Sequence, residues 1–378
     1  MKKIKIMHFV SGLAFGGVEQ MLYNYCKFMS NEKYEFVIVY QHEAIKECEE
    51  KFREIGVRTY RISARSESFV KNITDSIEIL KKENPDIVHA HMNLMNFCAL
   101  YAAKRAKVKN RISHSHIAEV GNGIIKRVVF SIFKMLCRVT ATNYLACGYD
   151  AGVYLYGKKM MENNSVNIIT NAIDLKYYER NENERLEFRK KYSLENNLVI
   201  GHIGRFTEQK NHKKVVDIFN RIHRKCDSAR LVLVGNGYLE NDIKSYVNEL
   251  GIAEYVLFVG SISEMRGVYS AFDGFVLPSL YEGLPVVSIE VQAARIPSVF
   301  STTIDKSCKM TDYIKFVYLE EDDESWAEIV LEEIKRTHKT DIYELEKSYD
   351  IRYKKYELEE FYDKVVEVGS ERKYGNQT

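Results

Sequence analysis

Several features that mark particular protein classes are scarce in this chain. Its 378 residues include only four prolines, and 55 basic residues nearly balance 53 acidic ones, which leaves a net charge of +2. A protein with so little net charge has no overall field that would draw it to nucleic acid. The seven cysteines stand singly, without a Cys-x-x-Cys pair, which is typical of reduced thiols in a cytoplasmic protein.

Long hydrophobic runs are also missing. No segment reaches the roughly 18 uncharged apolar residues that a membrane-spanning helix needs. The chain starts with a basic pair, as a signal peptide would, but Lys5 and His8 interrupt the apolar stretch that should follow. We therefore interpret residues 4–10 as a first β-strand. Any association with the inner face of the plasma membrane is expected to be peripheral.

What the sequence does contain is a regular alternation of two patterns. Short apolar runs such as 4–10, 36–40 and 86–90 alternate with helical periods such as 18–29 and 73–82. This alternation predicts a parallel sheet with helices on both faces. The pattern stops at a charged, apolar-poor segment, residues 176–191, and then starts again.

The restart predicts two domains, in keeping with about 150 residues per domain. We expect an α/β fold in which two doubly wound, Rossmann-like domains, residues 1–175 and 176–350, face a central cleft. In each domain the ligand site should lie at the carboxyl ends of the strands. Residues 351–378 are expected to form a helix that packs back toward the first domain.

A glycine pair, Gly16 and Gly17, follows the first expected strand and opens a helix. Glycine lets a backbone approach a ligand closely, and the start of a helix presents free N–H groups. A tight strand-to-helix turn needs glycine too, so a purely structural role stays open. The segment has neither the Gly-Lys-Ser/Thr of a P-loop nor the spacing of a dinucleotide fingerprint, which disfavours nicotinamide chemistry.

Two cations follow the first strand of the second domain. Arg205 and Lys210 lie between the expected strand 198–203 and the next helix. A guanidinium fork and an ammonium point charge beside a helix start would clamp a pyrophosphate. The alternative is a solvated charged turn.

Two glutamates, Glu282 and Glu290, lie eight residues apart around Pro285. Because proline suits the first helical turn, Glu282 should sit at the mouth of a helix and Glu290 inside it. The two carboxylates could then address different parts of one extended ligand, and Glu290 would need a partner such as vicinal ribose hydroxyls. The alternative is a capping glutamate and a surface glutamate.

Four histidines alternate at the ends of two expected strands: His89 with His91, and His114 with His116. No carboxylate or thiol accompanies them in the spacing of metal ligands, so we expect no metal. Core histidines with satisfied rings are the alternative to a functional role.

These motifs, taken in order, resemble the family-four retaining glycosyltransferases of the GT-B fold, over about residues 4–304. The residues that carry the resemblance are Gly16-Gly17-Val18-Glu19, Gly204-Arg205 with Lys210, Leu233-Val234-Gly235-Asn236-Gly237, and Glu282-Gly283-Leu284-Pro285 with Glu290. Leu284-Pro285 replaces the commoner Phe-Gly, as in a subgroup that makes exopolysaccharide or capsule. The family's glycine after the second glutamate helix is also replaced, within Ala293-Ala294-Arg295, which puts local packing in doubt.

The resemblance implies a role for each matching residue. Arg205 and Lys210 would neutralise the leaving diphosphate in place of a metal, Glu282 would contact the transferred sugar, and Glu290 would bind the donor ribose. His116, or otherwise His114, would contact the donor sugar. The expected catalytic residues are therefore His116, Arg205, Lys210 and Glu282, and the expected donor-binding residues are Gly16, Gly17, Arg205, Lys210, Gly235, Gly237, Glu282, Gly283, Leu284 and Glu290.

The resemblance also implies an activity. The first domain would face the acceptor, and the second would bind a nucleotide diphosphate sugar, with a UDP-sugar favoured. A hexosyl or N-acetylhexosaminyl group would pass, without metal or other cofactor, to a lipid-linked or glycan acceptor in bacterial surface polysaccharide synthesis. The alternatives are a nucleotide-sugar epimerase and a noncatalytic nucleotide-sugar-binding subunit.

The segment 124–139 combines a helical apolar stripe with basic residues and no acidic residue. This pattern is typical of a helix that lies on an anionic membrane surface. An ordinary amphipathic helix packed on the sheet would look the same. The candidate membrane or acceptor surface comprises Lys126, Arg127, Phe133, Lys134 and Arg138.

Overall fold

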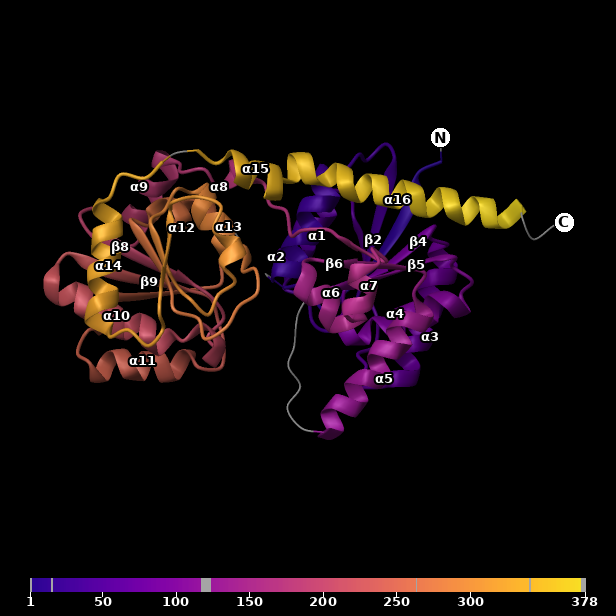
Figure 1. Cartoon of the computed structure of the whole chain (residues 1–378), viewed down its shortest axis with the longest axis horizontal. Coiled ribbons are helices and arrows are strands. Elements are labelled where there is room, and N and C mark those ends of the chain that lie inside the picture. Colours follow the sequence, from indigo (N-terminus) through magenta and orange to yellow (C-terminus); the bar gives the residue numbers. More distant parts are fainter. Residues whose placement is uncertain (1, 15, 117–123, 263, 340, 375–378) are drawn as a thin grey trace. The chain divides into compact units, whose positions relative to one another are not determined.

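The computed structural model describes residues 2–14, 16–116, 124–262, 264–339 and 341–374. The chain divides into two compact units (Figure 1): Met1–Ile173 together with Ile351–Thr378, and Asp174–Asp350. The first division therefore lies two residues before the expected position at 175. Each unit contains one parallel sheet with helices around it, which confirms the expected α/β fold class.

The N-terminal unit is built on a seven-stranded parallel sheet of order β3-β2-β1-β4-β5-β6-β7. Its strands are β1 (Ile4–Phe9), β2 (Tyr34–Tyr40), β3 (Arg58–Arg61), β4 (Ile87–Ala90), β5 (Asn110–Ser115), β6 (Asn143–Ala146) and β7 (Val166–Ile168). Its helices are α1 (Gly17–Phe28), α2 (Lys46–Glu54), α3 (Phe69–Glu83), η1 (Asn93–Met95), α4 (Asn96–Arg105), α5 (Ile124–Thr140), α6 (Tyr149–Tyr156), α7 (Lys158–Glu162) and α16 (Ile351–Tyr374).

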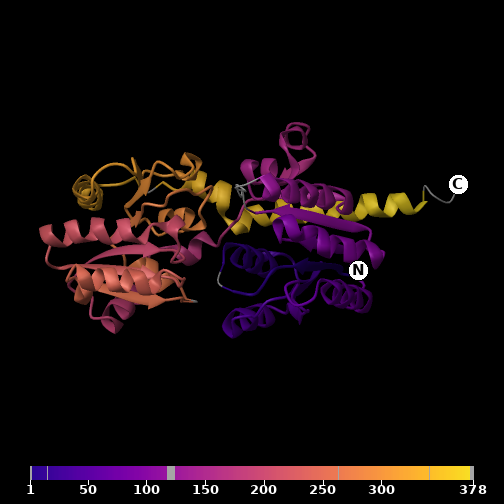
Figure 2. The ribbon, with the colours of Figure 1, turned by 90° about the horizontal axis from the view of Figure 1, so that it is seen from below.

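Alternate residues of the central strands pack into two different cores, as the period of two along a strand requires. On β1, Ile6 joins the core formed with α1 and α16, while Met7 joins the core formed with α3 and α4. Helices therefore cover both faces of this sheet (Figure 2). The strand order changes direction between β1 and β4, and a ligand site in such sheets usually lies at that point.

Helix α16 belongs to the N-terminal unit although it ends the chain. Its first N–H, at Ile351, donates to the carbonyl of Ile173 at 2.9 Å. Leu358 and Tyr362 are buried in the same core as α1. The helix begins at Ile351 because the chain breaks at Asp350, directly after α15 (Tyr343–Tyr349).

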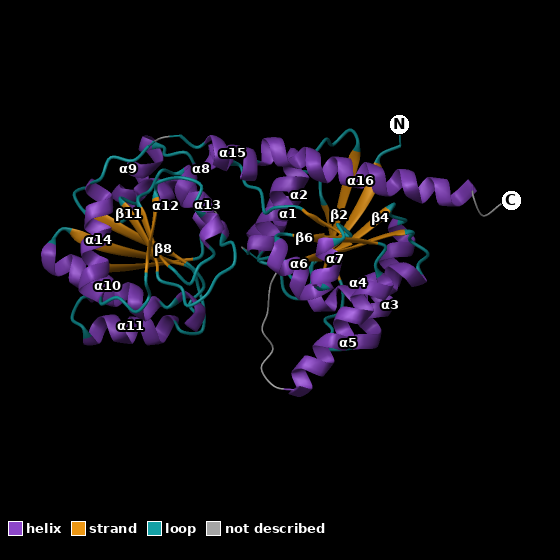
Figure 3. Ribbon diagram, in the orientation of Figure 1, coloured by secondary structure: helices purple, strands orange, loops and turns teal. Residues whose placement is uncertain are grey.

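The C-terminal unit has a six-stranded parallel sheet of order β10-β9-β8-β11-β12-β13 (Figure 3). Its strands are β8 (Leu198–Ile203), β9 (Ala229–Val234), β10 (Val256–Gly260), β11 (Gly274–Leu277), β12 (Ser298–Ser301) and β13 (Ile314–Val317). Its helices are α8 (Leu175–Tyr178), α9 (Glu182–Lys191), η2 (Glu208–Lys210), α10 (His212–Lys225), α11 (Glu240–Glu249), η3 (Ala253–Tyr255), α12 (Arg266–Ala271), α13 (Val286–Ala293), η4 (Lys306–Cys308), α14 (Asp323–Lys335) and α15 (Tyr343–Tyr349).

The charged segment 176–191 forms part of this second unit. Its charges are used internally, because Arg185 and Arg189 of α9 bind the carboxylate of Asp273 at 2.7 and 2.6 Å. Two guanidinium groups on one partly buried carboxylate attach α9 to the loop before β11. Among the described residues, none of the helices has the length and apolar character to cross a bilayer.

Candidate functional site

The centre of the site in the C-terminal unit is an ion pair between Lys210 and Glu282. The Lys210 Nζ lies 2.7 Å from Glu282 Oε1, and both side chains are largely buried, with exposed fractions of 15% and 9%. Lys210 ends the short helix η2 after β8, and Glu282 lies in the loop after β11. Because β8 and β11 are neighbours in the sheet, their carboxyl ends bring together two residues that are 72 positions apart.

Ser279 fixes the same carboxylate from a second direction. Its hydroxyl donates to Glu282 Oε1 at 2.5 Å, and its own carbonyl accepts from Ser301 and Thr303. The loop is also tied to η2, since the N–H of Leu280 donates to the carbonyl of Gln209 at 2.8 Å. Glu282 is therefore held in one orientation before any ligand binds.

Glu290 is inside α13, about two turns from Glu282. Hydroxyl groups of Tyr269, on α12, and Tyr178, on α8, donate to its carboxylate. Burial raises the pKa of Glu290, although both hydrogen bonds and the charge of Lys210 act against the shift. The sequence reasoning that a buried Glu290 needs a partner is met here by two tyrosines.

Arg205 differs from Lys210 because its side chain is exposed, and among the described residues it has no hydrogen bond or ion pair. It follows β8 directly, so its position is fixed by the sheet while its guanidinium remains available. A free guanidinium beside a loop of the site can bind a phosphate through two parallel hydrogen bonds.

Gly235 and Gly237 have a packing requirement of their own. A Cβ on Gly235, whose φ is +133°, would lie 2.2 Å from the carbonyl oxygen of Gly204. A Cβ on Gly237 would lie 2.3 Å from the carbonyl oxygen of Phe206. The loop after β9 packs with its backbone against the backbone of the loop after β8, so both glycines are needed for the fold. Contact of either glycine with a donor stays a prediction.

Gly283 and Leu284 lie just before the start of α13. A Cβ on Gly283 would meet no heavy atom within 4 Å, so this residue borders open space. The first N–H groups of a helix have no partner inside it, and their partial positive charge favours an anion. The glycine here is not demanded by packing, in contrast to Gly235 and Gly237.

In the N-terminal unit, Gly16 is the N-cap of α1 and Gly17 its first residue. The Gly16 backbone is extended, with φ −117°, and an added Cβ would meet the flexible carboxylate of Glu19. Neither fact requires glycine at position 16 for the turn. Contact of this residue with a ligand stays a prediction.

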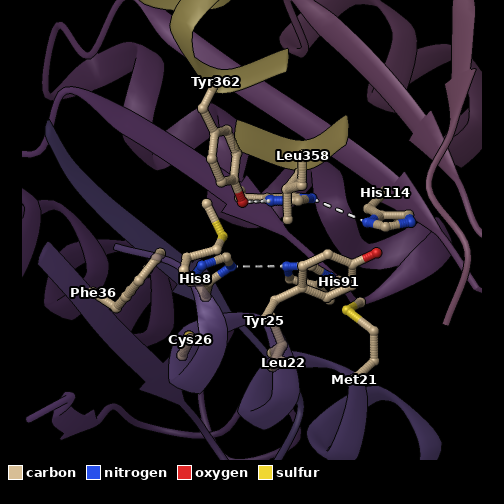
Figure 4. A pocket seen from close by; sticks show the side chains of 12 residues that line it. His8, Met21, Leu22, Tyr25, Cys26, Phe36, His91, His114, Leu358 and Tyr362 are labelled. Carbon is tan, nitrogen blue, oxygen red and sulfur yellow. Dashed lines mark hydrogen bonds between the residues drawn. The ribbon is translucent and has the colours of Figure 1, made fainter. Parts of the chain in front are cut away.

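Five imidazoles, not four, gather at the carboxyl ends of β1, β4 and β5. The ring nitrogens of His8 and His91 lie 3.0 Å apart, and those of His91 and His116 lie 2.9 Å apart. A second chain runs from Tyr362 of α16 through His89 to His114, with separations of 2.8 and 3.1 Å. Figure 4 shows Tyr362 reaching from α16 toward these rings, and His8 facing His91.

Two groups of three rings are close enough to hold a metal ion: His8 with His89 and His91, and His91 with His114 and His116. Each of these rings has at least one nitrogen that is hydrogen-bonded to another histidine of the cluster. Burial lowers the pKa of His8 and of His116 to about 3, so the rings are neutral at pH 7. The absence of a metal from this cluster stays a prediction.

On α5 the surface differs from the expectation in one residue. Phe133 does not face outward, because its ring stacks on Phe97 at 5.2 Å between centroids. Lys134 stacks its ammonium over the ring of Tyr154 at 3.9 Å, while Arg127 and Arg138 are exposed. The side chain of Lys126 lies outside the described residues. The exposed apolar residues of the helix are Val128, Val129, Ile132, Met135 and Val139.

A parallel α/β unit that gathers cations, carboxylates and a helix start at its strand ends is suited to a nucleoside diphosphate. The fold and this site together define a protein of two parallel α/β units with a charged candidate ligand site at the strand ends of the second.

Comparison with known proteins narrows this class to one family. A family model described as Glycosyltransferase Family 4 matches residues 15–177, and one described as Glycosyl transferases group 1 matches residues 197–335. EpsF of Bacillus subtilis (strain 168), a provisionally assigned glycosyltransferase, is 31% identical over 336 residues, 86% of each chain. The chain belongs to glycosyltransferase family 4, as the resemblance of its motifs implied.

Other relatives agree with this assignment. The Staphylococcus aureus capsular polysaccharide biosynthesis glycosyltransferase CapH is 24% identical over 367 residues, covering 95% of this chain and 98% of CapH. The Escherichia coli UDP-Gal:alpha-D-GlcNAc-diphosphoundecaprenol alpha-1,3-galactosyltransferase is 25% identical over 323 residues, 81% of each chain. The chain is thus a glycosyltransferase of polysaccharide or capsule biosynthesis.

The solved structure of Anabaena HepE in complex with UDP and glucose matches this fold with a TM-score of 0.78. The match covers 95% of this chain and 99% of that chain, at 14% identity. This likeness confirms the GT-B fold.

Sequence reasoning assigned no role to five residues of these arrangements: His8, Ser279, Tyr178, Tyr269 and Tyr362. Ser279 lies three residues before Glu282 inside the recognised motif, so the short spacing was a usable signal. Tyr178 and Tyr269 are 112 and 21 positions from Glu290, and no local pattern connects them to it. His8 was interpreted only as a break in an apolar run, although its place near the end of a strand matched that of the other histidines.

Proposed function

We propose that the chain transfers a hexosyl or N-acetylhexosaminyl group from a UDP-sugar, with retention of anomeric configuration, to a lipid-linked or glycan acceptor in bacterial surface polysaccharide synthesis. The observation that carries the proposal is the Lys210–Glu282 pair, fixed by Ser279 at the mouth of α13. The resemblance to the family supports retention. The names of the HepE structure and of the Escherichia coli relative support a UDP-sugar.

The chemistry proposed for the C-terminal unit is stabilisation of the leaving diphosphate. Negative charge builds on the phosphate as the bond to the sugar breaks, so Arg205 and Lys210 would act more strongly in the transition state than in the ground state. These two cations would take the place of a metal ion. The loop before α13 would add the N–H groups of Gly283 and Leu284.

Glu282 and Glu290 are proposed to recognise two different parts of the donor. Glu282 is already oriented and would accept hydrogen bonds from hydroxyl groups of the transferred sugar. Glu290 would accept from the vicinal ribose hydroxyls, with Tyr269 and Tyr178 holding the carboxylate in place. An acceptor hydroxyl would lose its proton to the departing phosphate, on the same face of the sugar.

In the N-terminal unit, His116 is proposed to contact the transferred sugar, and Gly16 and Gly17 to approach the diphosphate. Helix α5 is proposed to rest on an anionic membrane that carries the acceptor lipid. Its exposed row of Val128, Ile132, Met135 and Val139 repeats at helical spacing, and residues 124–140 contain no acidic side chain. Apolar burial and attraction to anionic headgroups add in such a helix.

The test is release of nucleoside diphosphate from a panel of nucleotide sugars, with and without lipid-diphosphate and free oligosaccharide acceptors. We expect one UDP-sugar to give release that rises with one acceptor and is lost in Arg205→Ala. Product NMR then reports the anomeric configuration. Inverted product would contradict retention; tight binding with no release under any acceptor, or epimerised donor, would contradict the transferase assignment.

A further inference from the structure

Four histidines of the cluster, His8, His89, His91 and His114, line a small cavity of about 10 Å³ between the sheet, α1 and α16. Two buried ring nitrogens of the cluster have no hydrogen-bond partner among the described residues. These are His116 Nδ1 and His114 Nε2. They terminate the two chains, His8–His91–His116 and Tyr362–His89–His114 (Figure 4).

The first chain obeys a strict rule on its protons. A neutral imidazole has one N–H donor and one bare nitrogen acceptor. Burial, followed by the neighbouring imidazoles, lowers the pKa of His91 well below its usual value, so this ring is neutral. Since His91 is hydrogen-bonded at both nitrogens, it must donate to one neighbour and accept from the other.

Two arrangements satisfy this rule. If His8 donates outward from Nδ1, then His91 donates from Nδ1 to His116 Nε2, and His116 carries its own proton on Nδ1. If the chain runs inward, all three rings carry the proton on Nε2 and His116 Nδ1 is a bare acceptor. The three rings therefore always share one tautomer. The proton position on His8 determines whether His116 Nδ1 carries a proton.

The second chain has a fixed direction. Tyr362 is fully buried, and His89 Nδ1 is the hydrogen-bond partner that the described residues offer its hydroxyl. The hydroxyl proton must therefore go to His89, which places the His89 proton on Nε2 and makes His114 an Nε2–H tautomer. The opposite direction would leave a buried hydroxyl proton without an acceptor, which is unfavourable.

We propose that His8 and His91 are positioning residues that set the tautomer of His116, and so decide whether its buried Nδ1 would donate to or accept from a hydroxyl of the transferred sugar brought against it. This inference rests on the proposed function of His116. Neither His8 nor His91 touches the sugar; they act by allowing His116 only the proton position that the whole chain shares. The neighbouring chain Tyr362–His89–His114 has only one allowed set of tautomers, so it serves as an internal reference for the tautomers of the first chain.

The test reads the tautomers directly, by NMR of the protein labelled with ¹⁵N-histidine, without donor. We expect His8, His91 and His116 to share one tautomer, and His89 and His114 both to be Nε2–H. Because no activity is needed, this result stands apart from the sugar-transfer assay. Different tautomers on His91 and His116 would overturn the proposal.

Variants then test whether the coupling matters for turnover. In His91→Phe, which keeps a ring of similar volume, His116 should become a mixture of tautomers and kcat should fall roughly five- to tenfold, with a smaller change in KM. His91→Gln, which still offers a donor and an acceptor, should recover part of kcat. An unchanged His116 tautomer and an unchanged kcat in His91→Phe would overturn the proposal.

Two controls separate coupling from packing. His89→Phe removes a buried imidazole from the same strand and should leave the His116 tautomer as in the wild type. Tyr25→Phe removes a hydroxyl that lines the same cavity and donates to the Thr170 carbonyl at 3.0 Å, outside both chains. If His91→Phe does not fold, His8→Phe replaces it as the test variant, one ring farther from His116. It should likewise give a mixture of His116 tautomers and a lower kcat, and no change in either would overturn the proposal.

Discussion

The candidate sites of the two units of this glycosyltransferase differ in the charge of their polar groups. In the C-terminal unit the central groups are charged and paired, as Lys210 with Glu282. In the N-terminal unit five imidazoles are buried and neutral, and they pair with one another. Fixed charge is suited to a leaving diphosphate, whereas neutral donors and acceptors are suited to the hydroxyl groups of a sugar.

The largest effect is expected from removing the paired cation. Lys210→Met keeps the length of the side chain and removes its charge, so we expect kcat to fall about 10²- to 10³-fold, the usual cost of a lost transition-state contact. The measurement is acceptor-dependent release of nucleoside diphosphate.

Lys213→Met is the matched control for this change. Lys213 is three residues farther along, in α10, and its ammonium lies over the ring of Tyr246 at 4.9 Å, away from Glu282. It should keep nearly all of the activity. Equal losses in both variants would mean that general charge, not the Lys210 position, is responsible.

Glu290→Gln should separate donor binding from stability. We expect donor affinity to fall roughly tenfold, because an amide is a weaker acceptor for ribose hydroxyls than a carboxylate. The pKa of Glu290 is raised by burial, so the folded state prefers the protonated form. That contribution to stability is present at acidic pH and is lost as the pH rises through the raised pKa.

The neutral glutamine avoids this loss. Glu290→Gln should therefore unfold at a higher temperature than the wild type at pH 7.5, and the difference should shrink toward pH 4. Calorimetry at the two pH values, beside donor titration, measures both effects. A variant that is less stable at pH 7.5 would mean that the hydrogen bonds from Tyr269 and Tyr178 outweigh the cost of burial.

Two glycines of the C-terminal unit should respond differently to alanine. Gly237→Ala places a Cβ against the Phe206 carbonyl and should cost about 2 kcal/mol or more of unfolding free energy. Gly283→Ala meets open space and should change stability little while raising the KM for the donor. Urea unfolding measures the free energy of unfolding of both variants, and donor kinetics measure their KM. Equal destabilisation of both variants would contradict the distinction between a packing glycine and a binding glycine.

The smallest effect is expected on α5. Replacing Ile132 and Met135 with serine removes exposed apolar surface, and binding to vesicles of anionic lipid should weaken severalfold. Leu186→Ser, which removes an exposed apolar side chain from the other unit, is the control. Sedimentation with vesicles measures both, and unchanged binding in the double variant would reject α5 as the membrane surface.

Much of this molecule could be predicted from the sequence. The alternation of apolar runs and helical periods gave the parallel sheets, since each pattern reflects a local period. The loop motifs around Lys210 and Glu282 were found for the same reason: each lies directly after a strand. The outward face of α5 was misjudged at Phe133, because an apolar helix position does not show which neighbour, here Phe97, will cover it.

The sequence could not predict side-chain contacts between elements that are far apart in the chain and meet only in the fold. Glu290 meets Tyr178 and Tyr269 only because α8, α12 and α13 pack together. Tyr362 meets His89 across 273 positions because α16 returns to the first sheet. Such contacts follow from the fold and leave no periodic trace in the residues themselves.

The proposed chemistry requires Arg205 and Lys210 to stabilise the leaving diphosphate in place of a metal ion. The most direct measurement is the rate of acceptor-dependent nucleoside diphosphate release by the wild type in excess EDTA, followed by addition of Mg²⁺ or Mn²⁺. The account predicts a rate that EDTA leaves unchanged and that either cation fails to raise. A rate that falls to background in EDTA and returns with the cation would contradict it.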